Sequence, residues 1–489
     1  MGRNKKQFPE LTVQRMHHSG YGYAVADERS LLVEEGLPGD VVNGVERRKK
    51  KGILHLRVDD FLSEGTPRVE PFCRHFDLCG GCTLQHVDYE TQLRLKSQIV
   101  ASALAESLEV SDAGLPGDPT GAPGTGSVPS KPVIAPLVEP ILPCEADRRY
   151  RNKMEYSFSN SRWLTEQEKD SGKEADRRAL GFHIPGRFDR VLDIDECHLQ
   201  PEPSNGIRNG LKEYALRKGY TFYDPREHVG LLRLLMIRTS LAGESQVTVM
   251  FGEDDPSARE EVLRFLQSEF PEINSLYYVV NTSKNDSLHP QEPIHVAGAP
   301  FIVEECGTLR FRIYPKSFYQ TNPSQAVRLY EVAREYAGLS GGETVYDLFS
   351  GIGSIALYLA DQAGTVIGIE SVEQAVGAAR ENAVLNGVEN VEFHHGEVEA
   401  LLDESFLGEH GTPDCVVLDP PRPGVHHKAL RVLLTARPRR IVYVSCNTET
   451  QGRDAAILSE AYDVERMRAV DMFPQTRHVE HVMLLTLRE

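Results

Sequence analysis

Residues 345–360 read VYDLFSGIGSIALYLA, and this stretch decides the fold of the region around it. An apolar run predicts a buried strand, the glycines after it predict a tight turn, and the apolar residues that follow predict a helix. Glycine lets the main chain approach a ligand closely, and the free N–H groups at a helix N-terminus attract polar ligand atoms. The stretch therefore predicts a strand–turn–helix unit that holds a cofactor at the carboxyl end of a parallel sheet.

Two cofactors fit this turn equally well. Gly351, Gly353 and Ala356 satisfy the dinucleotide pattern G-x-G-x-x-[GA], and Glu370 lies about where that pattern places the acid that binds a ribose. An S-adenosylmethionine pocket uses the same kind of turn and the same kind of acid. The turn alone leaves NAD and S-adenosylmethionine open.

Polar residues further along the chain favour the methyl donor. Asp347 lies on the strand before the turn, Asp419 begins the motif DPPRPG, Cys446 follows the apolar run IVYVS, and Glu480 precedes HVMLLTLRE. An NAD enzyme has no use for a thiol at a strand end beside a DPP turn, whereas methyl transfer can use a nucleophile there. We therefore interpret the pocket as S-adenosylmethionine-binding, with Cys446 as nucleophile, Glu480 as base, and Asp419 as an anchor for either the cofactor or the substrate base.

The 489 residues are too many for one hydrophobic core, and the pattern predicts three domains. Residues 1–63 alternate short apolar runs with glycines, which predicts a small antiparallel β-barrel. Residues 64–310 include a helix-like segment and several strand-like runs, which predicts a β-rich central domain. Residues 311–489 alternate strands and helices and predict an α/β domain with a parallel sheet. The Pro/Gly/Ser-rich residues 111–132 predict a flexible linker.

The cysteines predict a metal centre. Cys73, Cys79 and Cys82 form a C-x5-C-x2-C group, which is not the disulfide framework of a small secreted protein. A fourth ligand must come from elsewhere in the chain. Cys197, in the loop-like sequence IDECHLQP, is the preferred candidate, and Cys144, in ILPCEA, is the alternative.

The spacing of these cysteines favours an iron–sulfur cluster. Four thiolates hold either structural zinc or a [4Fe–4S] cluster, but zinc usually recruits two close pairs, whereas here three cysteines are clustered and one is remote. A radical enzyme would carry C-x3-C-x2-C, which this cysteine group is not. We therefore expect a structural or RNA-orienting cluster. Cys306 and Cys415 lie in strand-like runs and are expected to be core residues.

The formal net charge of −18 argues against a nucleic-acid partner, but two local basic runs argue for one. Residues 47–51 read RRKKK, and residues 148–156 contain four Arg or Lys residues interleaved with Tyr150 and Tyr156. Beside a base-modifying site, these runs predict contact with RNA. No apolar stretch approaches the roughly 20 residues of a membrane span, and the basic first residues precede no hydrophobic run. We expect a cytoplasmic monomer that does not enter a membrane.

Taken together, the motifs resemble those of the RNA uracil-5-methyltransferases, the family that includes the iron–sulfur 23S rRNA enzymes and the tRNA enzyme that makes ribothymidine. The resemblance extends over nearly the whole chain and rests on CRHFDLCGGC, SFYQTNP, DLFSGIGS, DPPRPG, SCN and DMFPQTRHVE. It implies a TRAM-type RNA-binding barrel at the N-terminus, a central iron–sulfur domain and a Rossmann-like methyltransferase domain. It also implies a [4Fe–4S] cluster on Cys73, Cys79, Cys82 and Cys197.

The resemblance implies an activity as well: transfer of a methyl group from S-adenosylmethionine to carbon 5 of a uridine in rRNA or tRNA, through a covalent cysteine–uracil intermediate. It assigns the nucleophile to Cys446 and the base to Glu480. The residues that it implies for the methyl donor are Gln320, Phe349, Glu370 and Asp419, with Ser354 and Glu397 as further contacts.

Two motifs depart from the family pattern. Thr448 stands where the family often has proline after SCN, and residues 475–478 read QTRH where it has HTGH. Neither departure touches the thiol or the acid, so they bear on the choice of substrate more than on the reaction. A non-catalytic iron–sulfur RNA-binding protein and an NAD-dependent oxidoreductase are the alternative interpretations.

Overall fold

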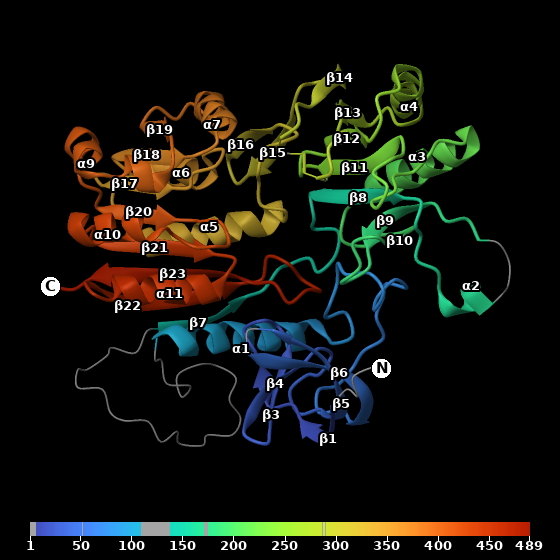
Figure 1. The fold of residues 1–489 in the computed structure, drawn as a ribbon. Helices are drawn as coiled ribbons and strands as arrows, with labels where there is room; N and C mark the ends of the chain where they lie inside the picture. Colours follow the sequence, from blue (N-terminus) through green and yellow to red (C-terminus); the bar gives the residue numbers. More distant parts are fainter. Residues whose placement is uncertain (1–5, 51, 109–136, 171–174, 286, 289) are drawn as a thin grey trace.

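The computed structural model describes residues 6–50, 52–108, 137–170, 175–285, 287–288 and 290–489 (Figure 1). The linker predicted at residues 111–132 lies outside the described residues. The described strands form sheets of six, seven, two and eight strands. No helix in this part of the chain is long and apolar enough to cross a membrane.

The N-terminal sheet rolls into a barrel-like shape. Its order is β1-β5-β6-β4-β3-β2, so β1 and β2 occupy opposite edges although only two residues separate them. The same stretch of chain thus runs along both edges. One pairing departs from the expected antiparallel barrel, because β4 and β6 are parallel. Residues 34–40 carry the chain from β4 past β6 to β5, and the β5–β6 hairpin then returns β6 alongside β4. The strands are β1 (Gln7–Thr12), β2 (Arg15–Met16), β3 (Gly22–Ala26), β4 (Arg29–Val33), β5 (Val41–Lys50) and β6 (Ile53–Ser63).

The central sheet has seven strands in the order β10-β9-β8-β11-β12-β13-β14. Strands form at residues 153–159 and 232–239, within the region that the sequence predicted to be β-rich. The pair β12–β13 is parallel because helix α4 connects the two strands. Helices α3 and α4 pack their apolar faces on the strands in one core. The elements are β8 (Lys153–Ser159), α2 (Glu166–Asp170), β9 (Ala179–His183), β10 (Val191–Asp193), α3 (Ser204–Lys218), β11 (Leu232–Thr239), β12 (Ser245–Phe251), α4 (Pro256–Glu269), β13 (Ile273–Val280) and β14 (Ile294–Gly298), followed by the hairpin β15 (Ile302–Cys306) and β16 (Leu309–Ile313).

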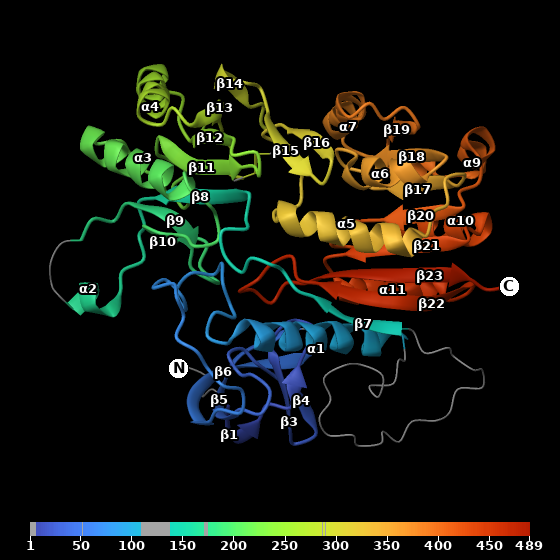
Figure 2. The same ribbon diagram turned by 180° about the vertical axis from the view of Figure 1, so that it is seen from behind.

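The C-terminal sheet is doubly wound, which confirms the predicted α/β fold. Its order is β19-β18-β17-β20-β21-β23-β22-β7, and the first five strands are parallel. Helices α5, α6 and α7 pack on one face, and α1, α10 and α11 pack on the other (Figure 2). The elements are α5 (Pro323–Ala337), β17 (Thr344–Leu348), α6 (Ser354–Leu359), η2 (Ala360–Gln362), β18 (Thr365–Glu370), α7 (Glu373–Leu385), β19 (Val391–His395), α8 (Val398–Leu401), α9 (Glu404–His410), β20 (Cys415–Leu418), α10 (His427–Ala436), β21 (Arg440–Ser445), α11 (Thr448–Leu458), β22 (Tyr462–Val470) and β23 (Glu480–Leu487).

Two elements of this layer come from far upstream. Strand β7 (Leu137–Leu142) pairs in parallel with β22, and helix α1 (Tyr89–Leu108) lies against α11. The approach of the two helices is close, because a Cβ at Gly452 would stand 2.8 Å from the Cβ of Ser107. Both elements lie within the central domain predicted at residues 64–310, so the boundary expected at residue 311 does not bound this sheet. The sequence of a single short strand does not show which other strand it pairs with.

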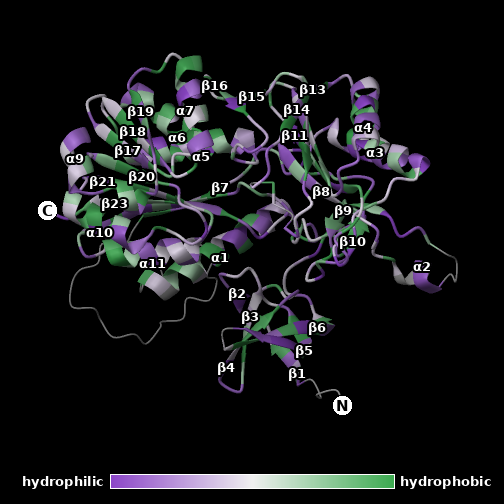
Figure 3. Cartoon of the chain, turned by 45° about the horizontal axis from the view of Figure 1, so that its top comes forward, coloured by the Kyte–Doolittle hydropathy of each residue, from purple (hydrophilic) through white to green (hydrophobic). Residues whose placement is uncertain are grey.

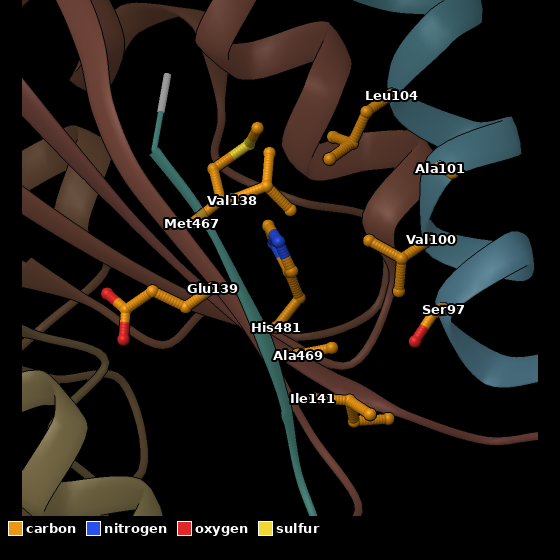
Figure 4. Close-up of a pocket in the computed structure, with 10 residues that line it drawn as sticks. All are labelled: Ser97, Val100, Ala101, Leu104, Val138, Glu139, Ile141, Met467, Ala469 and His481. Carbon is orange, nitrogen blue, oxygen red and sulfur yellow. The ribbon is translucent and has the colours of Figure 1, made fainter. Parts of the chain in front are cut away.

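A small cavity of about 30 Å³ lies where α1 covers β7 and β22 (Figure 4). The imidazole of His481 points into it. His481 is buried, and burial lowers its pKa to about 3, so the ring is neutral at physiological pH. Because side chains alternate along a strand, this cavity and Glu480 lie on opposite faces of β23. The other lining residues are Ser97, Val100, Ala101, Leu104, Val138, Glu139, Ile141, Met467 and Ala469. In Figure 3 the strands of the C-terminal sheet form an apolar interior between helices with mixed surfaces.

Candidate active site

The predicted site residues gather at one edge of the C-terminal sheet. Phe349, Asp419 and Cys446 each follow the last residue of a parallel strand, and Glu370 ends another. Glu480 begins β23, which runs antiparallel to β21, so its first residue lies at the same edge. Ser445 pairs with His481 in that ladder, which sets Cys446 opposite Glu480.

The glycine turn after β17 needs its glycines. Gly351 and Gly353 have φ of 55° and 82°, in the left-handed region that favours glycine. A Cβ at Gly353 would stand 2.7 Å from the ring of Phe393. The turn is tied to both neighbouring acids, because the N–H of Gly351 donates to Glu370 (2.9 Å) and the N–H of Ala356 donates to Asp347 (2.9 Å).

Two buried polar atoms beside this turn make no hydrogen bond. They are Oδ1 of Asp347 and the hydroxyl oxygen of Ser350. Leaving such atoms unpaired costs about 1–3 kcal/mol each. A polar ligand at this turn would recover part of that cost, so the donor set suits a nucleoside-type cofactor.

Three carboxyl groups in this region have raised pKa values. Burial, with Asp419 adding to it, raises the pKa of Asp347 to about 8, and burial raises that of Asp419 to about 7. Burial also raises the pKa of Glu480 to about 8; the charge of Asp419 acts in the same direction, and Arg422 opposes it. Like charges that cannot all ionise in one desolvated site favour a bound cation. A sulfonium is such a cation.

The thiol of Cys446 lies between an acid and a cation. Its side chain reaches the surface, but desolvation of its surroundings raises its pKa to about 11, and Glu480 adds to the rise. The guanidinium of Arg422 opposes both effects and lowers the pKa of the thiol. Arg422 follows the DPP turn and is not among the site residues predicted from the sequence. Its position directly after that turn was the only available signal.

The remaining predicted cofactor residues lie on neighbouring elements. Gln320 is buried just before α5, and its carbonyl accepts from the side chain of Asn152 (3.2 Å). Ser354 begins α6, and its hydroxyl accepts from Tyr330 (3.2 Å). Glu397 is exposed after β19, where the preceding N–H of Gly396 donates to the carbonyl of Glu370 (2.9 Å). This hydrogen bond holds the residue before Glu397 at the strand end formed by Glu370.

The loop of residues 471–479, which leads directly into Glu480, is held by N-terminal elements. Lys96 of α1 forms a fully buried ion pair with Asp471 (2.5 Å), and Tyr89 donates to the same carboxylate (2.9 Å). The carbonyl of Gln475 accepts from the N–H groups of residues 83 and 84, next to Cys82. The side-chain oxygen of Gln475 accepts from the side-chain amide of Gln92, and the backbone N–H of Gln475 donates to the side-chain oxygen of Gln92. The QTRH departure therefore forms part of this attachment.

The same loop contacts the N-terminal sheet. The guanidinium of Arg477 lies 4.6 Å from the ring centre of Tyr21, and a Cβ at Gly20 would stand 2.3 Å from the Arg477 side chain. The strand that carries Glu480 is thus positioned by three regions of the chain.

The structure groups Cys197 with the trio of cysteines. The thiols of Cys73, Cys79 and Cys82 each have a pKa raised first by burial and further by the charge of Cys197. Cys144 lies elsewhere, because its sulfur accepts from Asn322 (3.3 Å) and donates to the carbonyl of residue 146 (3.1 Å). Cys306 and Cys415 are buried in the sheet core, as predicted.

The two basic runs differ in which of their side chains are exposed. Residues 47–50 of β5 are exposed, although Arg47 and Arg48 pair with Glu34. In the second run, Tyr150 and Tyr156 are buried core residues. Their hydroxyls donate to a carbonyl and to a glutamine side chain, so these two rings pack inside the protein and are not exposed between the basic residues.

Comparisons with known proteins agree with this geometry. A family model for tRNA (uracil-5-)-methyltransferases matches residues 302–488. An uncharacterized RNA methyltransferase of Porphyromonas gingivalis is 44% identical over 470 residues, which are 94% of this chain and 96% of the relative. Another, from Bacteroides thetaiotaomicron, is 41% identical over 478 residues, 97% of this chain and 100% of the relative.

A solved structure matches almost the whole chain. The tRNA (uracil-54, C5)-methyltransferase of Pyrococcus abyssi, in complex with S-adenosyl-L-homocysteine, aligns with a TM-score of 0.70 at 26% identity. The alignment covers 97% of this chain and 99% of that one. These matches favour a methyltransferase over the NAD-dependent and non-catalytic alternatives. The chain belongs to the RNA uracil-5-methyltransferase family and is an S-adenosylmethionine-dependent RNA methyltransferase.

Proposed function

We propose that this enzyme methylates carbon 5 of a uridine in RNA through a covalent adduct between Cys446 and carbon 6 of the base. The observation that carries the proposal is the register of β21 and β23, which sets the thiol opposite a buried carboxyl at the sheet edge. Nitrogen methylation is disfavoured, because Arg422 stands where an amino-group methyltransferase carries an aromatic residue after its proline turn.

Methylation at carbon 5 requires both the thiol of Cys446 and the carboxylate of Glu480. Carbon 5 of uracil is a weak nucleophile, so the thiolate of Cys446 first adds to carbon 6, and the electron pair of the double bond between carbons 5 and 6 moves into an enolate. S-adenosylmethionine is a substrate that would supply its methyl group to carbon 5 and leave as S-adenosylhomocysteine, which keeps the electron pair of the broken S–CH₃ bond. Glu480 in its ionised form then removes the proton from carbon 5. The electron pair of that C–H bond restores the double bond between carbons 5 and 6 and expels the thiolate.

The pKa values in the site support Cys446 as the nucleophile and Glu480 as the base. A carboxyl with a pKa near 8 is a stronger base than an ordinary glutamate, yet it is partly ionised at neutral pH. Arg422 favours the thiolate that begins the reaction. We assign the ribose of the methyl donor to Glu370 and its sulfonium end to the region of Asp347 and Asp419. Phe349, Gln320, Ser354 and Glu397 are proposed as further contacts.

We also propose a [4Fe–4S] cluster on Cys73, Cys79, Cys82 and Cys197. In the described part of the chain, no three of these sulfurs lie within 4.8 Å of one another. Thiolates on one tetrahedral zinc, with bonds of about 2.3 Å, stand only about 3.8 Å apart. The thiols of Cys73, Cys79 and Cys82 nevertheless lie near Cys197, whose charge raises the pKa of each of them, and this supports a shared centre. Iron should be lost from Cys197→Ser protein and retained in Cys144→Ser protein.

The RNA substrate is proposed to be a loop or a locally opened strand. A uracil must leave its stack before a side chain can attack carbon 6. The Pyrococcus relative is described as acting on uracil-54 of tRNA. For this chain, both tRNA and rRNA loops are proposed substrates, with residues 47–50 as a phosphate-binding strand.

The proposal is tested with RNA that carries 5-fluorouridine. Fluorine cannot leave as a cation, so the wild-type enzyme should form a stable adduct that migrates as a slower band on a denaturing gel. Cys446→Ala should form no band while it still binds S-adenosylmethionine. Glu480→Gln should accumulate the same band with ordinary RNA, because the carbon 5 proton stays in place.

Cys415→Ala is the matched control, since Cys415 is buried in the core and should not affect adduct formation. An adduct formed by Cys446→Ala would mean that another residue is the nucleophile.

A further inference from the structure

A second group of metal-binding side chains lies at the far edge of the C-terminal sheet. Glu392 and His394 are two residues apart on the edge strand β19 and so project from the same face. His410 ends helix α9, which packs beside this strand (Figure 1). One ligand atom from each of the three residues lies within 4.8 Å of the others. We propose that these residues bind a divalent transition-metal ion of the zinc type.

The atoms are spaced for one ion. Nε2 of His394 lies 3.2 Å from Oε1 of Glu392, and Nδ1 of His410 lies 3.9 Å from Oε2 of the same carboxylate. Ligands on a tetrahedral zinc with bonds of about 2.0–2.1 Å stand roughly 3.3 Å apart. The two carboxylate–imidazole separations lie on either side of that spacing. Two imidazoles and one carboxylate form a donor set that zinc accepts.

Two further observations separate this group from ordinary surface packing. Nε2 of His394 is buried and makes no hydrogen bond, although the carboxylate is 3.2 Å away. A metal ion would satisfy this lone pair. The other nitrogen of His410, Nε2, faces Glu409 at 4.0 Å. A small movement of the exposed Glu409 side chain would let it accept from this nitrogen, an interaction that orients the ring and raises its basicity in many metal sites.

The position of the group suggests what the ion would do. β19 is the outermost strand of the sheet, and Glu397 lies two residues beyond its end. An ion held by β19 and α9 would fasten this edge strand to its covering helix. In this site Glu392, His394 and His410 are ligands, and Glu409 is a positioning residue.

The test uses the full-length protein with its cysteine centre intact. After removal of loosely bound metal, the protein is titrated with Co²⁺, whose visible absorption reports the ligand type. One equivalent should bind without the thiolate charge-transfer absorption that cysteine ligands produce, and Zn²⁺ should displace it. His410→Gln should weaken Co²⁺ binding by at least about tenfold, and Glu409→Gln by about tenfold.

His395→Gln is the matched control. His395 is the next residue on β19, projects from the opposite face, and contacts the carbonyl of Ser371. The His395→Gln protein should bind Co²⁺ with the same affinity as the wild type. Binding of S-adenosylmethionine by each variant checks that the protein is folded. Equal Co²⁺ affinity in wild type and His410→Gln would overturn the proposal, as would wild-type protein that binds no cobalt outside the cysteines.

Discussion

At the scale of single residues, neighbouring groups of opposite charge shift the pKa of the Cys446 thiol in opposite directions. Desolvation and Glu480 hold it protonated, and Arg422 favours the thiolate. The thiolate is the nucleophile, so its population limits the rate of addition to uracil. Because the pKa of the thiol is raised to about 11, the thiolate fraction rises with pH throughout the neutral range.

Replacement of Arg422 should therefore slow the first step. Without the guanidinium, the pKa of the thiol rises further, and each unit lowers the thiolate fraction at a given pH about tenfold. We expect Arg422→Ala to form the 5-fluorouridine adduct about tenfold more slowly than the wild type at saturating RNA, with the same ratio throughout the neutral pH range, because both thiols ionise only well above it. Arg422→Lys should retain more of the rate. A rate equal to that of the wild type at saturating RNA would mean that Arg422 acts on RNA binding instead.

At the scale of elements, the loop of residues 471–479 determines where β23 begins. The buried pair of Lys96 and Asp471 holds one end of the loop. Burial alone lowers the pKa of Lys96, and Asp471 opposes that change. Each charge thus depends on its partner to remain buried.

Lys96→Met should leave the carboxylate of Asp471 buried without its cation. Breaking such a pair costs about 3–5 kcal/mol, whereas replacing both partners costs much less. We expect a lowered denaturation midpoint and slower methylation for the single variant. The Lys96→Met/Asp471→Leu double variant should regain much of the stability. Chemical denaturation of both proteins measures the difference, and equal stability of the single variant and wild type would contradict the proposed role of the pair.

Local sequence patterns predicted the elements better than the pairings between them. The glycine turn and the alternation of strands and helices depend on neighbouring residues, so the strand ends that carry Phe349, Asp419 and Cys446 were predictable from sequence. The parallel pairing of β4 with β6 and of β7 with β22 depends on contacts between distant segments. The burial of Tyr150 and Tyr156 likewise follows from the packing of the central sheet, which basic neighbours in the sequence do not reveal.

At the scale of the whole molecule, the methyltransferase layer is not a contiguous segment. β7 covers the edge of β22, and α1 covers α11 and one face of the sheet. A fragment of residues 311–489 lacks both and would expose an unpaired strand edge and an apolar face. We expect this fragment to aggregate, whereas residues 64–489 should fold and bind S-adenosylmethionine. Size-exclusion chromatography and cofactor titration distinguish the two. A monomeric, cofactor-binding 311–489 fragment would contradict this expectation.

The pairing of β7 with β22 also has a consequence for biosynthesis. Glu139 and its ion-pair partner Arg466 are 327 residues apart in the chain. At about 5–20 residues per second, a ribosome needs roughly 16–65 s to make the intervening polypeptide. During that interval the nascent β7 has no partner strand, while the central sheet is already complete enough to form. Strand β22, which leaves the ribosome near the end of synthesis, must therefore pair with the much earlier β7. A chaperone that shields β7 would be needed most in that interval.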